Sequence, residues 1–170
     1  MEPKVHSMAA ESTDPIWTSE ELAAIGAGCA AFNIKKASRA ITRLYAAAFA
    51  AIDLEPTQFT LLVACSRQDT VAMSALAARM SMNASALARN VAVLERRGLL
   101  RIAPGDADRR VRNLSITSSG KRTLARALPH WQSVQDRLAD HIGRDELHRA
   151  VALMKTMTRA GERLLKPARS

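Results

Sequence analysis

Aromatic residues and cysteines are scarce in this chain of 170 residues. Aromatic residues make up 4% of it, and its two cysteines are Cys29 and Cys65. The sequence has no Cys-x-x-Cys motif and no cluster of cysteine and histidine at the spacing of metal ligands. This pattern argues against a disulfide framework and against a zinc site. We expect no metal, no cofactor and reduced thiols.

Long apolar runs are also missing. The first residues, MEPKVHSMAAESTDP, do not resemble a signal peptide. The longest apolar stretch, Tyr45 to Ile52, is far shorter than a membrane-spanning helix. We therefore expect a cytoplasmic protein with no membrane partner, and we interpret residues 1–17 as a mobile tail.

No set of catalytic residues emerges from the sequence. His141 and His148 flank Asp145, but no third residue that would orient either imidazole can be named. A nucleophile with its base and a cofactor-binding loop are both lacking. We expect that the protein is not an enzyme.

Basic residues are abundant, and they are concentrated in one segment. The whole chain has a formal charge of +9. The segment from Val71 to Arg126 has eleven basic and three acidic residues, a net charge of +8. The basic residues are Arg79, Arg89, Arg96, Arg97, Arg101, Arg109, Arg110, Arg112, Lys121, Arg122 and Arg126. Such a segment suits a polyanion, either nucleic acid or an anionic membrane surface, and the alternative is that it only confers solubility.

Periodicity and turn residues predict a mainly helical chain, in keeping with its many alanines. A first helix is expected from about Glu20 to Ile52, broken near Gly26 and Gly28, and Pro56 opens a second helix. This second helix covers about Thr57–Cys65. The helices predicted after it are Ser74–Met80, Ala84–Arg97, Ser118–Ile142 (kinked at Pro129) and Asp145–Leu165. Their predicted caps are Asn83, Gly98 and Thr117.

Two short strands are expected between the central and the C-terminal helices. They cover Leu99–Ala103 and Val111–Ile116, and residues 104–110 have the composition of a hairpin tip. Helix, turn, helix and two-stranded hairpin is the order of a winged helix-turn-helix. The predicted fold is therefore mainly α with a small β-hairpin wing.

The helix Ala84–Arg97 has two different sides. Leu87, Val91 and Leu94 fall on one side and are expected to pack on Leu76 and Met80. The other side carries Ser85, Arg89, Ala92, Val93 and Arg96. A helix fits the DNA major groove, where arginine can bind guanine through two hydrogen bonds. The alternative is an ordinary solvated helix face.

The hairpin tip offers a second contact with DNA. Asp108 can pair with Arg110 and fix its direction. An arginine held out on a loop can enter a narrow minor groove, where the negative potential is enhanced. The alternative is an ordinary turn with a surface ion pair.

These motifs together resemble the MarR family of bacterial transcriptional regulators. The family's wing usually shows Asp-x-Arg followed by Leu-x-Leu-Thr, and this chain has Asp108-x-Arg110 and then Leu114-Ser115-Ile116-Thr117. The segments FNIKKASRAITRLY and QFTLL resemble the family's first two helices. The resemblance covers about residues 20–165.

The resemblance implies more than the residues show. Members are homodimers whose first, fifth and sixth helices interlock; they bind pseudo-palindromic double-stranded DNA, usually as repressors, and many release it when a small aromatic or lipophilic anion binds. It implies dimerisation segments at 18–55 and 118–166 and a DNA-binding domain at 56–117. The residues implied to contact DNA are Ser85, Ala86, Arg89, Asn90, Arg96, Asp108, Arg109 and Arg110.

Candidates for the effector site combine charge with an aromatic ring. They are Asn33, Lys36, Arg39, His130 and Trp131. For each of them the alternative is a structural or dimer-interface contact. Some members of the family sense oxidants through a cysteine near their start, where Cys29 lies, but we expect Cys29 and Cys65 to be buried, inert thiols. A redox-responsive repressor and a winged-helix module that binds only proteins remain the alternative functions.

Overall fold

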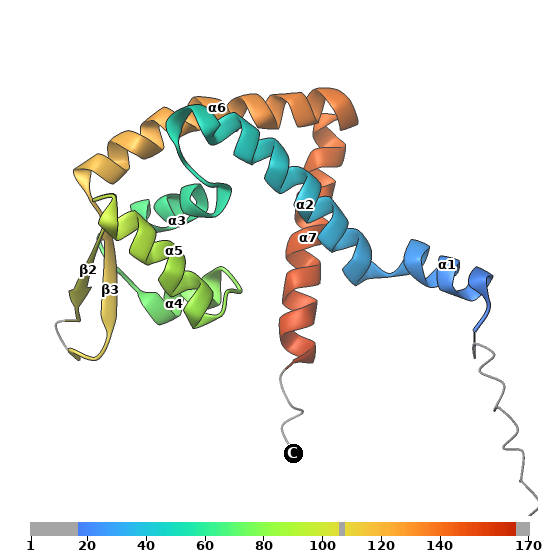
Figure 1. The fold of residues 1–170 in the computed structure, drawn as a ribbon, viewed down its shortest axis with the longest axis horizontal. Coiled ribbons are helices and arrows are strands. Elements are labelled where there is room, and N and C mark those ends of the chain that lie inside the picture. Colours follow the sequence, from blue (N-terminus) through green and yellow to red (C-terminus); the bar gives the residue numbers. More distant parts are fainter. Residues whose placement is uncertain (1–16, 106–107, 166–170) are drawn as a thin grey trace, which may run out of the picture. The chain divides into compact units, whose positions relative to one another are not determined.

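The computed structural model describes residues 17–105 and 108–165. The predicted mobile tail lies outside these residues, apart from Trp17. The chain divides into two compact units, residues 1–40 and residues 41–170. It is mainly helical, with one small sheet, as predicted (Figure 1).

The first unit contains helix α1 (Ser19–Gly28) and the start of α2 (Ala30–Phe49). The Thr18 Oγ1 atom accepts a hydrogen bond from the Glu21 amide at 3.1 Å, and the Glu21 carboxylate accepts one from the Thr18 amide at 2.7 Å. This capping box satisfies amides that the first turn leaves free. The break predicted near Gly26 and Gly28 lies at Cys29, whose backbone is extended, and both glycines belong to α1.

The second unit holds the remaining elements. The short helix η1 (Ala50–Ile52) follows α2 directly. The further helices are α3 (Pro56–Ser66), α4 (Met73–Arg79), α5 (Ala84–Arg96), α6 (Ser118–Ile142) and α7 (Arg144–Leu164). Each matches its predicted span to within one residue at either end.

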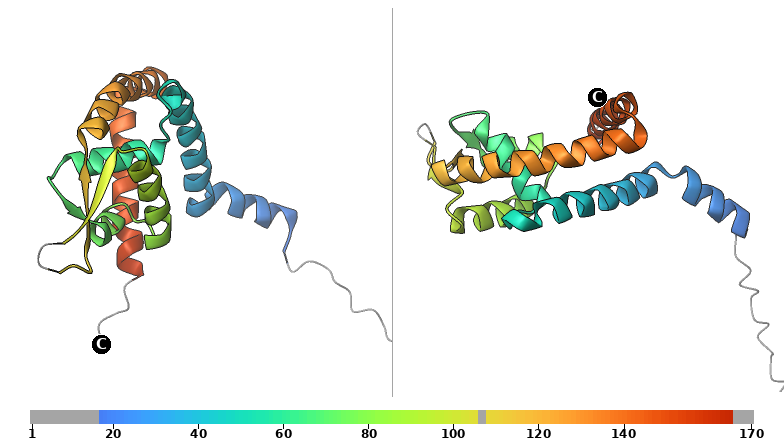
Figure 2. Two further views of the ribbon diagram at one scale, coloured as in Figure 1. Left: turned by 60° about the vertical axis from the view of Figure 1, so that its left-hand side comes forward. Right: turned by 90° about the horizontal axis from the view of Figure 1, so that it is seen from above.

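The sheet has three antiparallel strands in the order β1-β3-β2. The predicted hairpin consists of β2 (Leu100–Pro104) and β3 (Arg112–Ile116), each starting one residue later than expected. Strand β1 (Val71–Ala72) was not predicted; it pairs with β3 immediately before α4. Strands β2 and β3 run side by side as a two-stranded hairpin (Figure 2).

A core of aliphatic side chains joins α3, α4, α5 and the sheet. The predicted packing of Leu87, Val91 and Leu94 against Leu76 is confirmed, since all four are fully buried in one cluster. Met80 is partly buried against the same cluster. The helix-turn-helix and the hairpin therefore share one core.

The first turn of α6 is held closely against the base of the hairpin. The predicted cap Thr117 accepts a hydrogen bond from the Gly120 amide at 3.0 Å and donates one to the Gly98 carbonyl at 2.7 Å. A Cβ atom on Gly120 would lie 2.2 Å from the Leu99 carbonyl oxygen. Only glycine fits such a close approach of two backbones.

In the described ranges, no single helix is long and apolar enough to cross a membrane. Ala30–Ile52 and Pro56–Ser66, taken together as a bent pair, meet the criteria of length and composition. The second member of this pair, α3, buries six of its residues in the core of the protein.

Candidate nucleic-acid interface

The turn between α4 and α5 is tightly hydrogen-bonded. Ser81 adopts a left-handed conformation with φ of 48°, and the Met82 amide donates to the Ala77 carbonyl at 3.0 Å. Asn83 then caps α5, as predicted: its Oδ1 atom accepts hydrogen bonds from the Ala86 amide at 2.7 Å and from the Ser85 hydroxyl at 2.9 Å. The start of α5 is thereby fixed relative to α4.

The outer side of α5 carries the side chains proposed to read bases. Ser85, Arg89 and Arg96 are exposed, while Ala86 and Asn90 are partly buried. The Asn90 amide donates a hydrogen bond to the Ala86 carbonyl at 3.0 Å. Arg89 is therefore an exposed cation near the middle of this side, flanked by small residues.

The tip of the hairpin brings Asp108 and Arg110 together, as the sequence predicted. The Asp108 Oδ1 atom lies 3.2 Å from Arg110 Nε and accepts a hydrogen bond from the Arg110 amide at 2.9 Å. These bonds from the side chain and then the backbone of Arg110 lower the pKa of Asp108. The Arg110 side chain is 92% exposed, so the pair aims a guanidinium into solvent.

The hairpin closes just behind this pair. The Gly105 amide donates to the Val111 carbonyl at 2.8 Å, and the Val111 amide donates to the Asp108 carbonyl at 3.0 Å. A Cβ atom on Gly105 would lie 2.9 Å from the Asp108 carbonyl oxygen, so a larger residue would push the tip apart. The base of the tip is therefore a defined structure.

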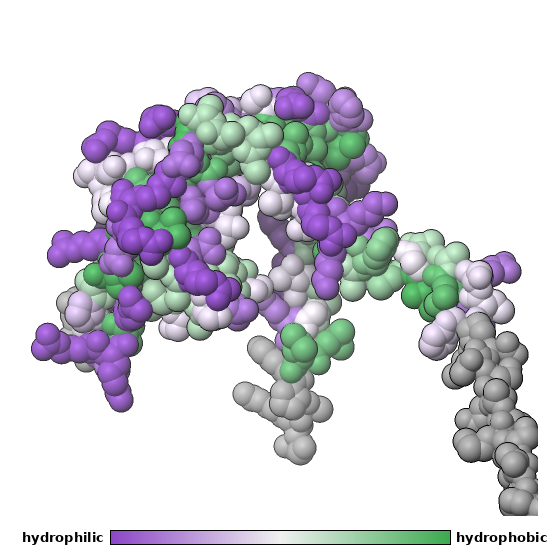
Figure 3. Space-filling model, in the orientation of Figure 1, coloured by the Kyte–Doolittle hydropathy of each residue, from purple (hydrophilic) through white to green (hydrophobic). Residues whose placement is uncertain are grey.

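Exposed cations surround the helix-turn-helix and the hairpin, and hydrophilic side chains cover the wing (Figure 3). These exposed basic residues are Arg79, Arg89, Arg96, Arg101, Arg109, Arg110, Arg112, Lys121, Arg122 and Arg126. Among the described residues, Arg110 is the one member of this set with an ion-pair partner. The other charges are free to neutralise phosphates.

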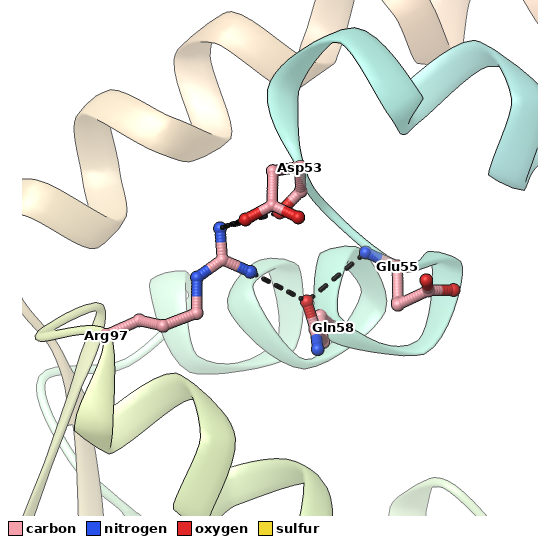
Figure 4. A network of polar contacts seen from close by, with 4 residues as sticks. All are labelled: Asp53, Glu55, Gln58 and Arg97. Carbon is pink, nitrogen blue, oxygen red and sulfur yellow. Dashed lines mark hydrogen bonds and ion pairs between the residues drawn. The ribbon is translucent and has the colours of Figure 1, made fainter.

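Arg97 differs from the other arginines of this segment (Figure 4). Its Nη2 atom donates to the Asp53 carbonyl at 2.6 Å and lies 3.1 Å from the Asp53 carboxylate. Its Nη1 atom donates at 3.1 Å to the Oε1 atom of Gln58, which also accepts a bond from the Glu55 amide at 3.2 Å. Arg97 is thus held by contacts within the protein, and its charge is partly neutralised by Asp53.

The predicted effector residues fall in different surroundings. The Asn33 side-chain amide donates to the carbonyls of Ala27 and Cys29, both at 3.0 Å, so it bridges the break between α1 and α2. Lys36 and Arg39 are exposed on α2, in the first unit. Asn33 therefore has a structural contact, the alternative that the sequence left open.

Trp131 borders a small cavity in the second unit. The cavity has a volume of about 120 Å³. It is lined by Tyr45, Phe49, Pro56, Phe59, Thr60 and Trp131. His130 is half-buried and is not part of this lining. Sequence analysis missed Tyr45 and Phe59, because they meet Trp131 only in the folded chain.

The two thiols differ. Cys65 is fully buried, and burial raises its pKa to about 11, although the positive charge of Arg79 partly opposes this shift. Cys29 is only half-buried. The expectation of a buried thiol is therefore confirmed for Cys65 and wrong for Cys29.

Comparison with known proteins identifies the family. A family model described as the MarR family matches residues 52–111, which include α3, the helix-turn-helix and the start of the wing. The crystal structure of the Mycobacterium tuberculosis regulator MosR in complex with DNA is 31% identical, with a TM-score of 0.69 over 78% of this chain and 97% of MosR. The chain belongs to the MarR family. It is a DNA-binding transcriptional regulator and not an enzyme.

Two further comparisons agree with this assignment. The transcriptional regulator HosA of Escherichia coli O157:H7 is 29% identical over 105 residues, which are 62% of this chain and 78% of HosA. The repressor CouR, solved with a 23-mer DNA duplex, has a TM-score of 0.72 at 24% identity, over 84% of this chain and 98% of CouR. The likeness to CouR supports the winged helix-turn-helix fold of this MarR-family member.

Proposed function

We propose that this MarR-family protein is a repressor that binds a pseudo-palindromic operator as a homodimer. The observation that carries the proposal is the pair of exposed arginines, Arg89 and Arg110, on two elements that share one core. A rigid core between a groove-reading helix and a wing is what recognition of two adjacent grooves requires.

In this proposal α5 enters the major groove. Arg89 is exposed and has the reach to bind a guanine edge through two hydrogen bonds. Ser85, Ala86 and Asn90 on the same helix are small enough to let its first turns approach bases and phosphates closely. Arg96, near the end of the helix, supplies a phosphate contact.

The wing enters the adjacent minor groove. Asp108 holds the Arg110 guanidinium in one direction, and the neighbouring Arg109 adds positive charge at the tip. An ordered arginine loses less conformational entropy on binding than a free one. The wing pair therefore contributes affinity at the narrow minor groove.

The homodimer is supported by the surface of α7. None of its 21 residues is buried in the chain, and Val151 and Met154 are 45% and 43% exposed. Contiguous exposed apolar surface of this kind marks an interaction site. We propose that residues 18–55 and 118–166 form the dimerisation region and residues 56–117 the DNA-binding domain, in a cytoplasmic protein.

The effector that we propose is a small aromatic anion. The cavity beside Trp131, of about 120 Å³, is lined mainly by apolar and aromatic side chains, which suit contact with an aromatic ring. His130 directly precedes Trp131 in the sequence and stays a predicted contact of the anion. Lys36 and Arg39 belong to the first unit and stay a separate prediction for anion binding.

The wing provides the test of DNA binding. Titration of one operator duplex at fixed salt should give the affinity order wild type, Asp108→Ala, Arg110→Ala. Arg110→Ala should lose about tenfold or more, the size of one lost base contact. Circular dichroism controls for folding, which should not change because residue 110 is exposed at a hairpin tip.

The same titration separates the alternatives. The duplex is the DNA upstream of the protein's own gene, and aromatic acids and their thioesters are added to test release. A protein-interaction module would not shift this DNA, and a thiol switch would release it with peroxide instead. Wild-type affinity in Arg110→Ala would show that the hairpin does not read DNA.

A further inference from the structure

We propose that Arg97 is a positioning residue for DNA recognition. It holds the C-terminal end of α5 against the turn at Asp53 and the first turn of α3, and so sets the direction in which Arg89 faces the DNA (Figure 4). This inference rests on the proposed binding of DNA through α5.

The contacts of Arg97 suit the fixing of an angle. The guanidinium is planar and presents its donors in a rigid fork, so two acceptors in different segments define its orientation. One acceptor, Gln58, is only 7% exposed and is held by the Glu55 amide as well. The other, Asp53, adopts a left-handed conformation with φ of 50°, which fixes where its carbonyl points.

Stability is not the main consequence of these contacts. The Asp53 side chain is 96% exposed, and ion pairs with so much water around them stabilise a fold little. The apolar contacts of Leu87, Val91 and Leu94 already bury the inner side of α5. Aliphatic contacts are non-directional, however, so they restrain the tilt of the helix less sharply than hydrogen bonds of fixed geometry do. The polar contacts of Arg97 therefore help to fix the orientation of α5 on the core.

The tilt matters because of the length of α5. A helix of 13 residues is about 20 Å long, and a tilt of about 10° about one end moves the other end by about 3 Å. Arg89 lies near the middle of the helix and would move by about 1 Å. That shift exceeds the range of about 0.5 Å within which a base hydrogen bond keeps good geometry, so base contacts of Arg89 would be weakened. Contacts with phosphates made by flexible side chains would survive it.

A substitution of Asp53 tests whether Arg97 acts through its charge alone or by positioning α5, because the two explanations predict opposite changes in DNA affinity. If charge alone governed DNA affinity, removal of the Asp53 carboxylate would strengthen binding. If Arg97 positions α5, Asp53→Gly should instead weaken binding to a specific site, although by less than a change of Arg97 itself, because the backbone carbonyl of residue 53 still accepts from Arg97. Glycine keeps the left-handed conformation without strain, so the turn itself is retained. Asp140→Ala is the matched control, because it removes an exposed carboxylate from α6.

The conservative variant Arg97→Lys gives a second test. Lysine keeps the charge but presents a single ammonium, which does not reproduce the planar fork. A residue that acted by charge alone would tolerate this change. A positioning residue would not, and the loss should exceed that of Asp53→Gly, which leaves two of the three contacts of Arg97 in place.

Binding is measured by fluorescence anisotropy with two duplexes: one selected from a random-sequence library by the wild-type protein, and a scrambled duplex of the same composition. We expect Arg97→Lys to bind the selected duplex about tenfold more weakly, the size of one base contact, and Asp53→Gly to show a smaller loss of about threefold. Affinity for the scrambled duplex and the salt slope should stay unchanged, because no phosphate contact is removed. Thermal melting and sedimentation verify folding and assembly.

Three results would overturn the proposal. In the first, Asp53→Gly binds the selected duplex as tightly as wild type or more tightly. In the second, either variant weakens both duplexes equally, which indicates a general loss of structure. In both cases DNA binding by the protein stands and only the role of Arg97 falls. In the third, the wild type selects no sequence from the library, and the proposed function itself is then wrong.

Discussion

The winged helix-turn-helix and helix α7 represent two opposite ways of using apolar residues. Helix α5 buries Leu87, Val91 and Leu94 completely, and α3 buries six of its eleven residues. Helix α7 is almost twice as long as α3 and buries none. The first region makes its own core, whereas the second carries apolar side chains that the single chain leaves exposed.

This difference separates two kinds of stability. Substitutions in the core of the winged helix-turn-helix, called the module below, should change the folding stability of each chain, because this core is complete within one copy. Substitutions on α7 should change assembly, because there the apolar surface is available to a partner. Three predictions, in order of decreasing effect, test this separation.

The largest effect is expected in the module core. Leu87→Ala should lower the free energy of unfolding by about 2–5 kcal/mol, because the fully buried side chain leaves a cavity. Urea denaturation followed by circular dichroism at several protein concentrations measures it. A loss below about 0.5 kcal/mol, the range of surface substitutions, would show that the core is less closed than described.

Substitutions on α7 should change the stability of the folded chain less, but they should clearly weaken the dimer. Val151→Asp places a charge on the exposed apolar stripe of α7 that Val151 forms with Met154, and it should shift the dimer towards monomer in sedimentation. The matched control is Thr156→Asp, which adds the same charge about 140° around the helix. Equal dissociation constants for the two variants would contradict an interface on this stripe.

The smallest effect is expected at the thiols. The pKa of Cys65 is raised, so its thiol stays protonated at neutral pH and should resist iodoacetamide until the module unfolds. Because the folded state favours the neutral thiol, the associated stability is present below the pKa of the unfolded thiol and declines as pH rises towards 11. Mass spectrometry of Cys29→Ser follows Cys65 alone; rapid labelling of the native variant would contradict its burial.

Local signals predicted most of the fold. Thr117 followed by a long periodic stretch gave α6 its observed bounds, and Asn83 marked the start of α5. These signals act within one turn of the chain, so they can be read without knowing the fold. Strand β1 could not be predicted, since its two residues form a strand only through pairing with β3. The break at Cys29 likewise depends on hydrogen bonds made by Asn33.

In the candidate site, too, contacts between residues close in the sequence could be predicted, whereas contacts between distant residues could not. Asp108 and Arg110 are two residues apart, and their predicted pairing is present in the structure. Arg97 and Asp53 are 44 residues apart, and a count of charges could not show that one neutralises the other. The aromatic cavity joins residues from α2, α3 and α6, so it too becomes visible only after folding.

The close contact at Gly120 has a mechanical consequence. Because the first turn of α6 is packed against the backbone at Leu99, we expect the base of the wing and the start of α6 to move together. A helix of 25 residues is about 37 Å long. A rotation of about 5° at its far end therefore carries the wing through about 3 Å, close to the rise of one base pair. In the proposed dimer, the angle between the α6 helices of the two protomers then sets the distance between the two wings. A ligand that changes this angle by a few degrees would move the wings out of register with the operator half-sites.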